Sequence, residues 1–187
     1  MWSITSTADI TNSPHSIPQV PDRNRPLLLG SVLITCILLD QLTKALAKIY
    51  LSPLISSVYL DGALRLVYAH NSGVMLSLGV GWPEPVKFWL FGVIPAVLFV
   101  SLLVTVLVWR ALSTPAVIGA GLLIGGGMSN LLDRLLHQGM VIDFVSLSLL
   151  GRSTSIFNLA DLQISLGLVL LSGLLLLGRI RGRDGTG

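Results

Sequence analysis

Charged and aromatic residues are scarce in this sequence. Of its 187 residues, 11% are Asp, Glu, Lys or Arg, 6% are Phe, Trp or Tyr, and 52% are hydrophobic. A soluble domain of average composition carries about 25% charged residues, so this chain cannot cover a water-exposed surface with ionised side chains. The shortage excludes a soluble enzyme, a nucleic-acid-binding protein and a disordered chain. It predicts an integral membrane protein, because lipid is the solvent that tolerates such a surface.

Cysteine is almost absent as well. Cys36, the single cysteine, lies inside an apolar run, which excludes a disulfide framework and a multi-cysteine metal site and favours a buried thiol. Neither His70 nor His137 has a second His or Cys at the spacing of a metal site. We therefore expect no metal site and no cofactor.

Four apolar runs are long enough to cross a bilayer. They cover residues 27–47, 88–109, 111–132 and 159–178. About 20 residues at roughly 1.5 Å per residue span the hydrocarbon core of a membrane. The predicted fold is a membrane all-α bundle of four transmembrane helices over residues 27–180.

The segments outside the four runs differ from them in composition. Residues 1–26 are polar and predict a disordered extension, and residues 181–187 predict a basic tail. Residues 52–84 contain two β-prone stretches around an Asp61-Gly62 turn. We expect a small β-rich platform here, between the first and second helices.

Basic residues indicate the orientation. One group lies in short stretches beside the span ends, where the positive-inside rule applies: Arg23, Arg25, Arg110, Arg179, Arg181 and Arg183. This grouping predicts that both termini are cytoplasmic. The platform and the long segment between the third and fourth spans would then face outward.

Four of the nine acidic residues lie at or near the outward ends of the predicted spans: Asp40, Asp133, Asp143 and Asp161. A charged side chain at the centre of a spanning helix costs about 2.5–3.5 kcal/mol on insertion scales. Four acids at the same depth in the membrane therefore indicate ion pairing, a water-filled cavity or a catalytic role.

Spacing separates two of these acids from the others. Asp40 and Lys44 are four residues apart, which predicts an ion pair within one helix. Asp133 lies three residues after Asn130, on the same helical face, and directly before Arg134, a counter-charge for an acid nearby. Both groups are interpreted as structural networks.

Asp143 and Asp161 have no basic neighbour at such spacing, and Asp161 lies three residues after Asn158. Two unpaired carboxylates near a low-dielectric boundary can share one proton, so that one acts as general base and the other as general acid. Such a pair can activate water for peptide hydrolysis. A proton-coupled transporter would also keep acids at this depth, so spacing alone leaves both interpretations open.

Five sequence blocks resemble the lipoprotein signal peptidase (signal peptidase II) family, whose members are four-span aspartic peptidases. The blocks are DQLTK from Asp40, NSG from Asn71, GGMSNLLDR from Gly126, VIDF from Val141 and FNLAD from Phe157. They occur in the family's order. One departure is Leu76, where the family usually has Phe, which puts one wall of the substrate pocket and the inhibitor sensitivity in doubt.

The resemblance implies a role for each matched position. Asp143 and Asp161 match the catalytic pair. The positions that match substrate-binding or supporting residues are Asp40, Lys44, Asn71, Gly73, Asn130, Asp133, Arg134 and Asn158. No metal ligand is implied.

The resemblance also implies the reaction. The family removes signal peptides from diacylglyceryl-modified prolipoproteins, cleaving before the lipidated cysteine, in the bacterial inner membrane. We expect an active site near the outer face, prolipoproteins and membrane lipids as partners, and a monomer. The alternatives are a small four-span transporter and a non-catalytic lipoprotein-binding relative that use the same buried acids.

Overall fold

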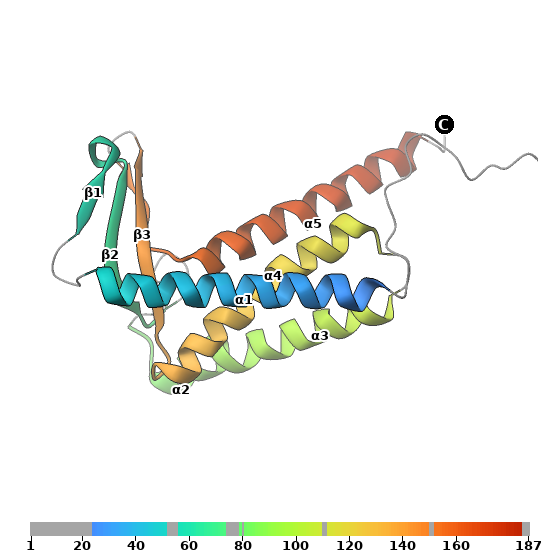
Figure 1. The fold of residues 1–187 in the computed structure, drawn as a ribbon. Coiled ribbons are helices and arrows are strands. Elements are labelled where there is room, and N and C mark those ends of the chain that lie inside the picture. The colour runs from blue at the N-terminus through green and yellow to red at the C-terminus, as the bar shows by residue number, and fades with distance from the viewer. Residues whose placement is uncertain are drawn as a thin grey trace, which may run out of the picture.

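The computed structural model describes residues 24–51, 56–73, 79, 81–109, 112–149 and 152–184. Its helices are α1 (Arg25–Tyr50), α2 (Glu84–Lys87), the π-helical stretch η4 (Phe88–Val93), α3 (Ile94–Val108), α4 (Thr114–Leu136) and α5 (Leu159–Asp184). α2, η4 and α3 run on from one another, so four helical stretches are long and apolar enough to cross a membrane. A small antiparallel sheet stands at one end of this bundle (Figure 1). The predicted fold class is confirmed.

α4 is the central helix of the bundle. In the most apolar part of α4, 56% of the residues are buried, against 11–17% in the other three stretches. α4 packs against α1, α3 and α5. Glycines permit this close approach. A Cβ atom at Gly121 would lie 2.7 Å from Val32, and one at Gly125 would lie 2.7 Å from Cys36, as expected of small residues at helix interfaces.

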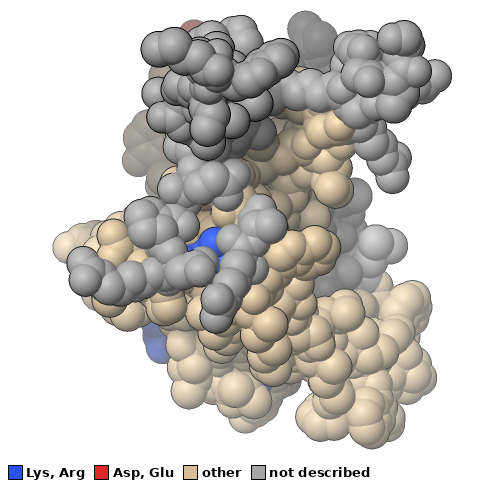
Figure 2. All heavy atoms as spheres, turned by 90° about the vertical axis from the view of Figure 1, so that its right-hand side faces the viewer, with Lys and Arg blue, Asp and Glu red and all other residues tan. Residues whose placement is uncertain are grey.

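The apolar core of the bundle lies far from the sheet. Leu29, Val106, Val117, Ala120 and Ile124 form it. Long apolar side chains cover the outside of the helices, for example Leu38 and Val97, which are 63% and 59% exposed. Viewed from the end opposite the sheet, the described surface shows basic side chains in only small areas (Figure 2). Lipid can cover such a surface.

The sheet has the strand order β1-β2-β3-β4 and is antiparallel throughout. β1 (Ser57–Tyr59) and β2 (Leu64–Asn71) form the expected hairpin. Its turn, η2 (Leu60–Gly62), has φ values of 53°, 51° and 91°. This left-handed backbone suits glycine and tolerates aspartate, which explains the Asp61-Gly62 pair.

The other two strands correct the prediction for the segment after α4. β3 (Val141–Leu149) and β4 (Arg152–Ser153) complete the sheet, although we expected β structure only within residues 52–84. The signal was present in the alternation of apolar and polar residues from Val145 to Ser148. The predicted platform was also too long at its C-terminal end, because Glu84 begins α2.

Several helix ends also differ from the predicted ones. α1 continues to Tyr50 and α4 to Leu136, beyond the predicted ends at 47 and 132. α4 can continue through Asp133 because this carboxylate pairs with Lys44. α1 begins at Arg25, inside the predicted N-terminal extension, and α5 reaches Asp184. Residues 1–23 of that extension, the departure at Leu76 and the last three residues of the predicted tail lie outside the described residues.

Candidate active site

A buried ion cluster lies at the sheet end of the bundle. Lys44 Nζ on α1 lies 2.6 Å from a carboxylate oxygen of Asp40 and 2.8 Å from one of Asp133. It also donates a hydrogen bond of 3.0 Å to Asn130 Oδ1. Lys44 is 2% exposed and both aspartates are 0% exposed. The predicted Asp40–Lys44 ion pair is confirmed, and Lys44 proves to be the cation that pairs with Asp133.

Two further polar residues belong to this cluster and were missed in the sequence. Ser129 Oγ donates a hydrogen bond of 2.7 Å to Asp40. Gln41 Nε2 donates one of 2.8 Å to Asp133 and one of 3.0 Å to Ser129. Ser129 could have been found from its position one helical turn before Asp133. A buried carboxylate is retained only when its oxygens are satisfied in this way.

The same two carboxylates hold backbone groups of other elements. Asp40 accepts a hydrogen bond of 2.8 Å from the N–H of Ala160, in the first turn of α5. Asp133 accepts one of 3.1 Å from the N–H of Ile142 on β3. The ion cluster therefore ties α1 and α4 to the two segments that carry Asp161 and Asp143.

Asp161 lies in the first turn of α5, where its spacing from Asn158 forms a capping box. The backbone N–H of Asp161 donates to Asn158 Oδ1 at 3.0 Å. The backbone N–H of Asn158 donates to Asp161 Oδ2 at 3.3 Å. These reciprocal bonds satisfy N–H groups that a helix N-terminus leaves without partners.

Side-chain amides connect Asp161 to Asp143. Asn158 Nδ2 donates to Asp143 Oδ1 at 2.7 Å and to Asn130 Oδ1 at 3.1 Å. Asn130 Nδ2 in turn donates to Asp161 Oδ1 at 3.0 Å. On the other side, Asn71 Nδ2 donates to Asp143 Oδ2 at 2.9 Å. Two amides, those of Asn71 on β2 and Asn158 just before α5, thus donate to the Asp143 carboxylate on β3, and Asn130 links Asn158 to Asp161.

Burial raises the pKa of Asp143 to about 6. The loss of hydration is the largest cause; the hydrogen bond from Asn71 opposes it, and the nearby charge of Asp161 adds to it. Among the described residues, neither Asp143 nor Asp161 has an ion-pair partner. Asp143 can therefore hold a proton in weakly acidic solution.

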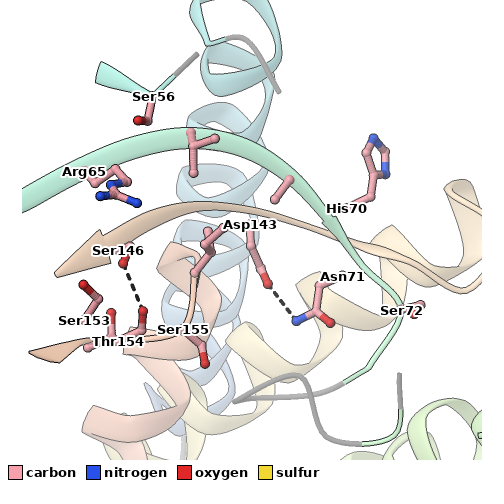
Figure 3. A pocket seen from close by; sticks show the side chains of 13 residues that line it. Ser56, Arg65, His70, Asn71, Ser72, Asp143, Ser146, Ser153, Thr154 and Ser155 are labelled. Carbon is pink, nitrogen blue, oxygen red and sulfur yellow. Dashed lines mark hydrogen bonds between the residues drawn. The ribbon is translucent and has the colours of Figure 1, made fainter. Parts of the chain in front are cut away.

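Two cavities meet at Asp143 and Asn71. The smaller, of about 200 Å³, contains Asp143, Asp161 and Arg134 among apolar side chains from η4, α3 and α4, such as Phe91 and Phe99. The larger, of about 600 Å³, lies against the sheet, and most of the residues that line it are polar (Figure 3).

Arg134 and Gly73 lie at the edge of the smaller cavity. Arg134 Nη2 donates to the Gly73 carbonyl at 3.0 Å, and Nη1 donates to the Asn130 carbonyl at 3.2 Å. The Gly73 N–H donates to Asn71 Oδ1 at 2.9 Å. Arg134 makes no ion pair within the described part of the chain, so it positions the 71–73 segment of the backbone.

His70 and His137 lie together, with ring centroids 6.3 Å apart. Across the residues that the structure describes, no group of three or more His, Cys, Asp and Glu side chains could hold a metal ion.

Comparison with known proteins identifies the family. A sequence model described as signal peptidase (SPase) II matches residues 32–177. The chain belongs to the signal peptidase II family. It is therefore a multi-pass bacterial membrane protein and a protease of lipoprotein processing.

Named relatives cover most of this signal peptidase II chain. A lipoprotein signal peptidase of Syntrophomonas wolfei is 35% identical over 79% of the chain and 91% of its own length. One from Leifsonia xyli is 35% identical over 98% of the chain and 87% of its own length. The resemblance seen in the five sequence blocks is confirmed.

Two solved structures, each described as a bacterial membrane enzyme, share the fold of this signal peptidase II chain. Their TM-scores are 0.68 and 0.69, at 20% and 23% sequence identity. They cover 92% and 87% of this chain, and 97% and 98% of their own.

Proposed function

We propose that this protein removes signal peptides from diacylglyceryl-modified prolipoproteins, and that Asp143 and Asp161 hydrolyse the peptide bond before the lipidated cysteine. The observation that carries the proposal is the amide network. Asn158 and Asn130 hold two carboxylates from different elements at one cavity, where no cation pairs with either among the described residues.

The pair would work as a shared acid and base. The ionised carboxylate takes a proton from water, whose oxygen attacks the carbonyl carbon of the scissile bond. The protonated carboxyl gives its proton to the carbonyl oxygen as the tetrahedral intermediate forms. The carboxyl that took the proton from water then gives it to the departing nitrogen, and the proton on the former carbonyl oxygen returns to the other carboxylate as the C=O bond re-forms. The C–N bond breaks, leaving a new carboxyl group on the signal peptide and a new amine on the lipidated cysteine.

The other matched residues would position this pair and the substrate. Lys44, Asp40 and Asp133 would hold α1, α4, α5 and β3 together, since their contacts join α1 to α4, α1 to α5 and α4 to β3. Arg134 and Gly73, at the edge of the smaller cavity, would bind the substrate backbone with Asn71.

The layout of the molecule fits a membrane-bound substrate. We place both termini in the cytoplasm and the sheet at the outer membrane surface, with residues 27–180 as one peptidase domain acting as a monomer. The apolar signal segment would lie beside the helices and the acyl chains would stay in the bilayer, where burial stabilises by about 0.8 kcal/mol per CH₂.

A gel-shift cleavage assay tests the proposal. The full-length protein in detergent is given a diacylglyceryl-modified prolipoprotein, with and without EDTA. We expect cleavage that EDTA does not change and that Asp143→Asn and Asp161→Asn each abolish. Asp61→Asn is the matched control, because Asp61 is exposed at the hairpin turn and asparagine also tolerates its φ of 51°.

Intact substrate in the presence of a folded parent protein would overturn the proposal and favour a non-catalytic relative. Full activity of either active-site variant would overturn the assignment of the aspartate pair.

A further inference from the structure

Most of the residues that line the larger cavity are polar, and the apolar Val67, Ala69 and Ile156 lie among them. Figure 3 shows Asp143 and Asn71 toward one end of it and Arg65, Ser146, Ser153 and Thr154 toward the other. Its volume of about 600 Å³ falls in the usual range of roughly 300–1,000 Å³ for a ligand site. Nothing in the proposed hydrolysis uses the end that lies away from Asp143.

Arg65 supplies the charge at that end. Strand pairing places it opposite Val58 on β1 and Ser146 on β3. Of the described residues that line the cavity, Arg65 and Asp143 are the two with formal charge. Within the described part of the chain, Arg65 has no hydrogen-bond or ion-pair partner. Its guanidinium is therefore available to a bound group.

Hydroxyl groups form the wall around Arg65. Ser146 and Thr154 come from facing segments, and Ser146 Oγ donates a hydrogen bond of 3.0 Å to the Thr154 carbonyl. Ser153 and Ser155 line the same wall. A hydroxyl can both donate and accept, so this wall can satisfy the N–H and C=O groups of an extended peptide.

The two cavities differ in the kind of chain that they suit. The smaller one has Phe91, Phe99 and Ile164 in its walls, as an apolar signal segment requires. The larger one is lined by residues of β2 and β3, and the sheet stands at the end of the bundle (Figure 1). A substrate cut at Asp143 would have one side of its scissile bond in each.

We propose that the larger cavity binds the mature polypeptide immediately after the lipidated cysteine, and that Arg65 makes this subsite select acidic over basic side chains. This inference rests on the proposed function. It adds a specificity-determining residue, because a carboxylate beside Arg65 gains an ion pair while a lysine there meets a like charge.

The test uses prolipoprotein substrates that differ only at the second and third residues after the lipidated cysteine, which are Asp-Asp, Ser-Ser or Lys-Lys. The readout is the ratio of kcat/KM for the acidic substrate to that for the basic one. This ratio cancels any loss of folded protein in a variant. We expect the parent protein to prefer the acidic substrate by about fivefold, the upper range for one partly exposed ion pair.

Variants at Arg65 assign the preference. Arg65→Ala should bring the ratio close to one, and Arg65→Glu should reverse it. Arg152→Glu is the matched control: Arg152 is exposed on β4, next to Ser153, but does not line the cavity. Its ratio should equal that of the parent.

Two results would overturn the inference, and they are distinguishable. Cleavage of all three substrates at equal rates, or an unchanged ratio in Arg65→Glu, overturns the subsite and leaves the proposed function standing. No cleavage of the Ser-Ser substrate by folded parent protein overturns the proposed function and the subsite with it.

Discussion

The side-chain amide of Asn158 donates a hydrogen bond of 2.7 Å to the carboxylate of Asp143. The same side chain caps α5 through its oxygen, which accepts the backbone N–H of Asp161. One residue thus sets both the start of the helix that carries Asp161 and the orientation of Asp143.

Loss of the Asn158 amide should lower the kcat/KM of cleavage more than it lowers the stability of the fold. We expect Asn158→Ala to lower kcat/KM about 100-fold, because a displacement near 1 Å of a reacting group costs about that much. Asn24→Ala is the control: Asn24 precedes α1 and makes no side-chain cap bond, so its kcat/KM should match that of the parent. Activity of Asn158→Ala within threefold of the parent would show that the amide does not position the pair.

The ion cluster should dominate the stability of the sheet end. Lys44→Met leaves Asp40 and Asp133 buried without their cation, which should lower the free energy of unfolding by about 3–5 kcal/mol. Lys87→Met breaks an ion pair with Glu84, which is largely exposed, and should cost at most about 1 kcal/mol. Unfolding of both variants in detergent measures the difference.

Adding Asp133→Asn to Lys44→Met should recover part of the loss, since it removes one of the two uncompensated charges. Equal stability of Lys44→Met and Lys87→Met would contradict the assignment of Lys44 as the buried counter-charge.

The pH dependence of cleavage should follow Asp143. Burial raises its pKa to about 6, and the proposed mechanism needs one proton on the pair. We expect kcat/KM to fall as the pH rises through about 6 and this proton is lost. Asn71→Ala removes a hydrogen bond that stabilises the ionised carboxylate, so the pKa of Asp143 should rise and the fall should move to higher pH.

The full pH profiles of parent and Asn71→Ala protein provide the measurement, with Asn24→Ala as the reference variant. A shift of the Asn71→Ala profile to lower pH would mean that Asn71 does not act on the titrating group.

The contact between α4 and α5 gives a fourth test. A Cβ atom at Gly126 would lie 2.6 Å from the carbonyl oxygen of Ala160, a backbone atom that cannot turn away. Gly126→Ala should therefore separate the helices, lower the free energy of unfolding by about 1–3 kcal/mol and reduce cleavage by displacing Asp161. Gly30→Ala, where nothing lies within 4 Å, should be neutral or slightly stabilising. Equal thermal stability of the two variants would contradict the close packing.

The number of membrane-spanning helices and the unusual placement of four acids at or near the span ends could be predicted because both depend on local properties. A span is defined by its own length and hydropathy, since its backbone hydrogen bonds are internal. An acid within such a run is conspicuous because of its cost in lipid. The Asp40–Lys44 pair follows from helical geometry in the same way, and the Asn158–Asp161 spacing contains the capping box.

The partners of these groups are decided by packing between distant segments. Lys44 and Arg134 are both cations at this end of the bundle, yet Asp133 pairs with Lys44, because α1 and α4 pack so that the lysine lies between two carboxylates. β3 joins β2 through pairing with residues at least 70 positions earlier, for example Ala69 with Asp143. Strand pairing of this range has no local signature, and it brings Asp143 to the amide of Asn71.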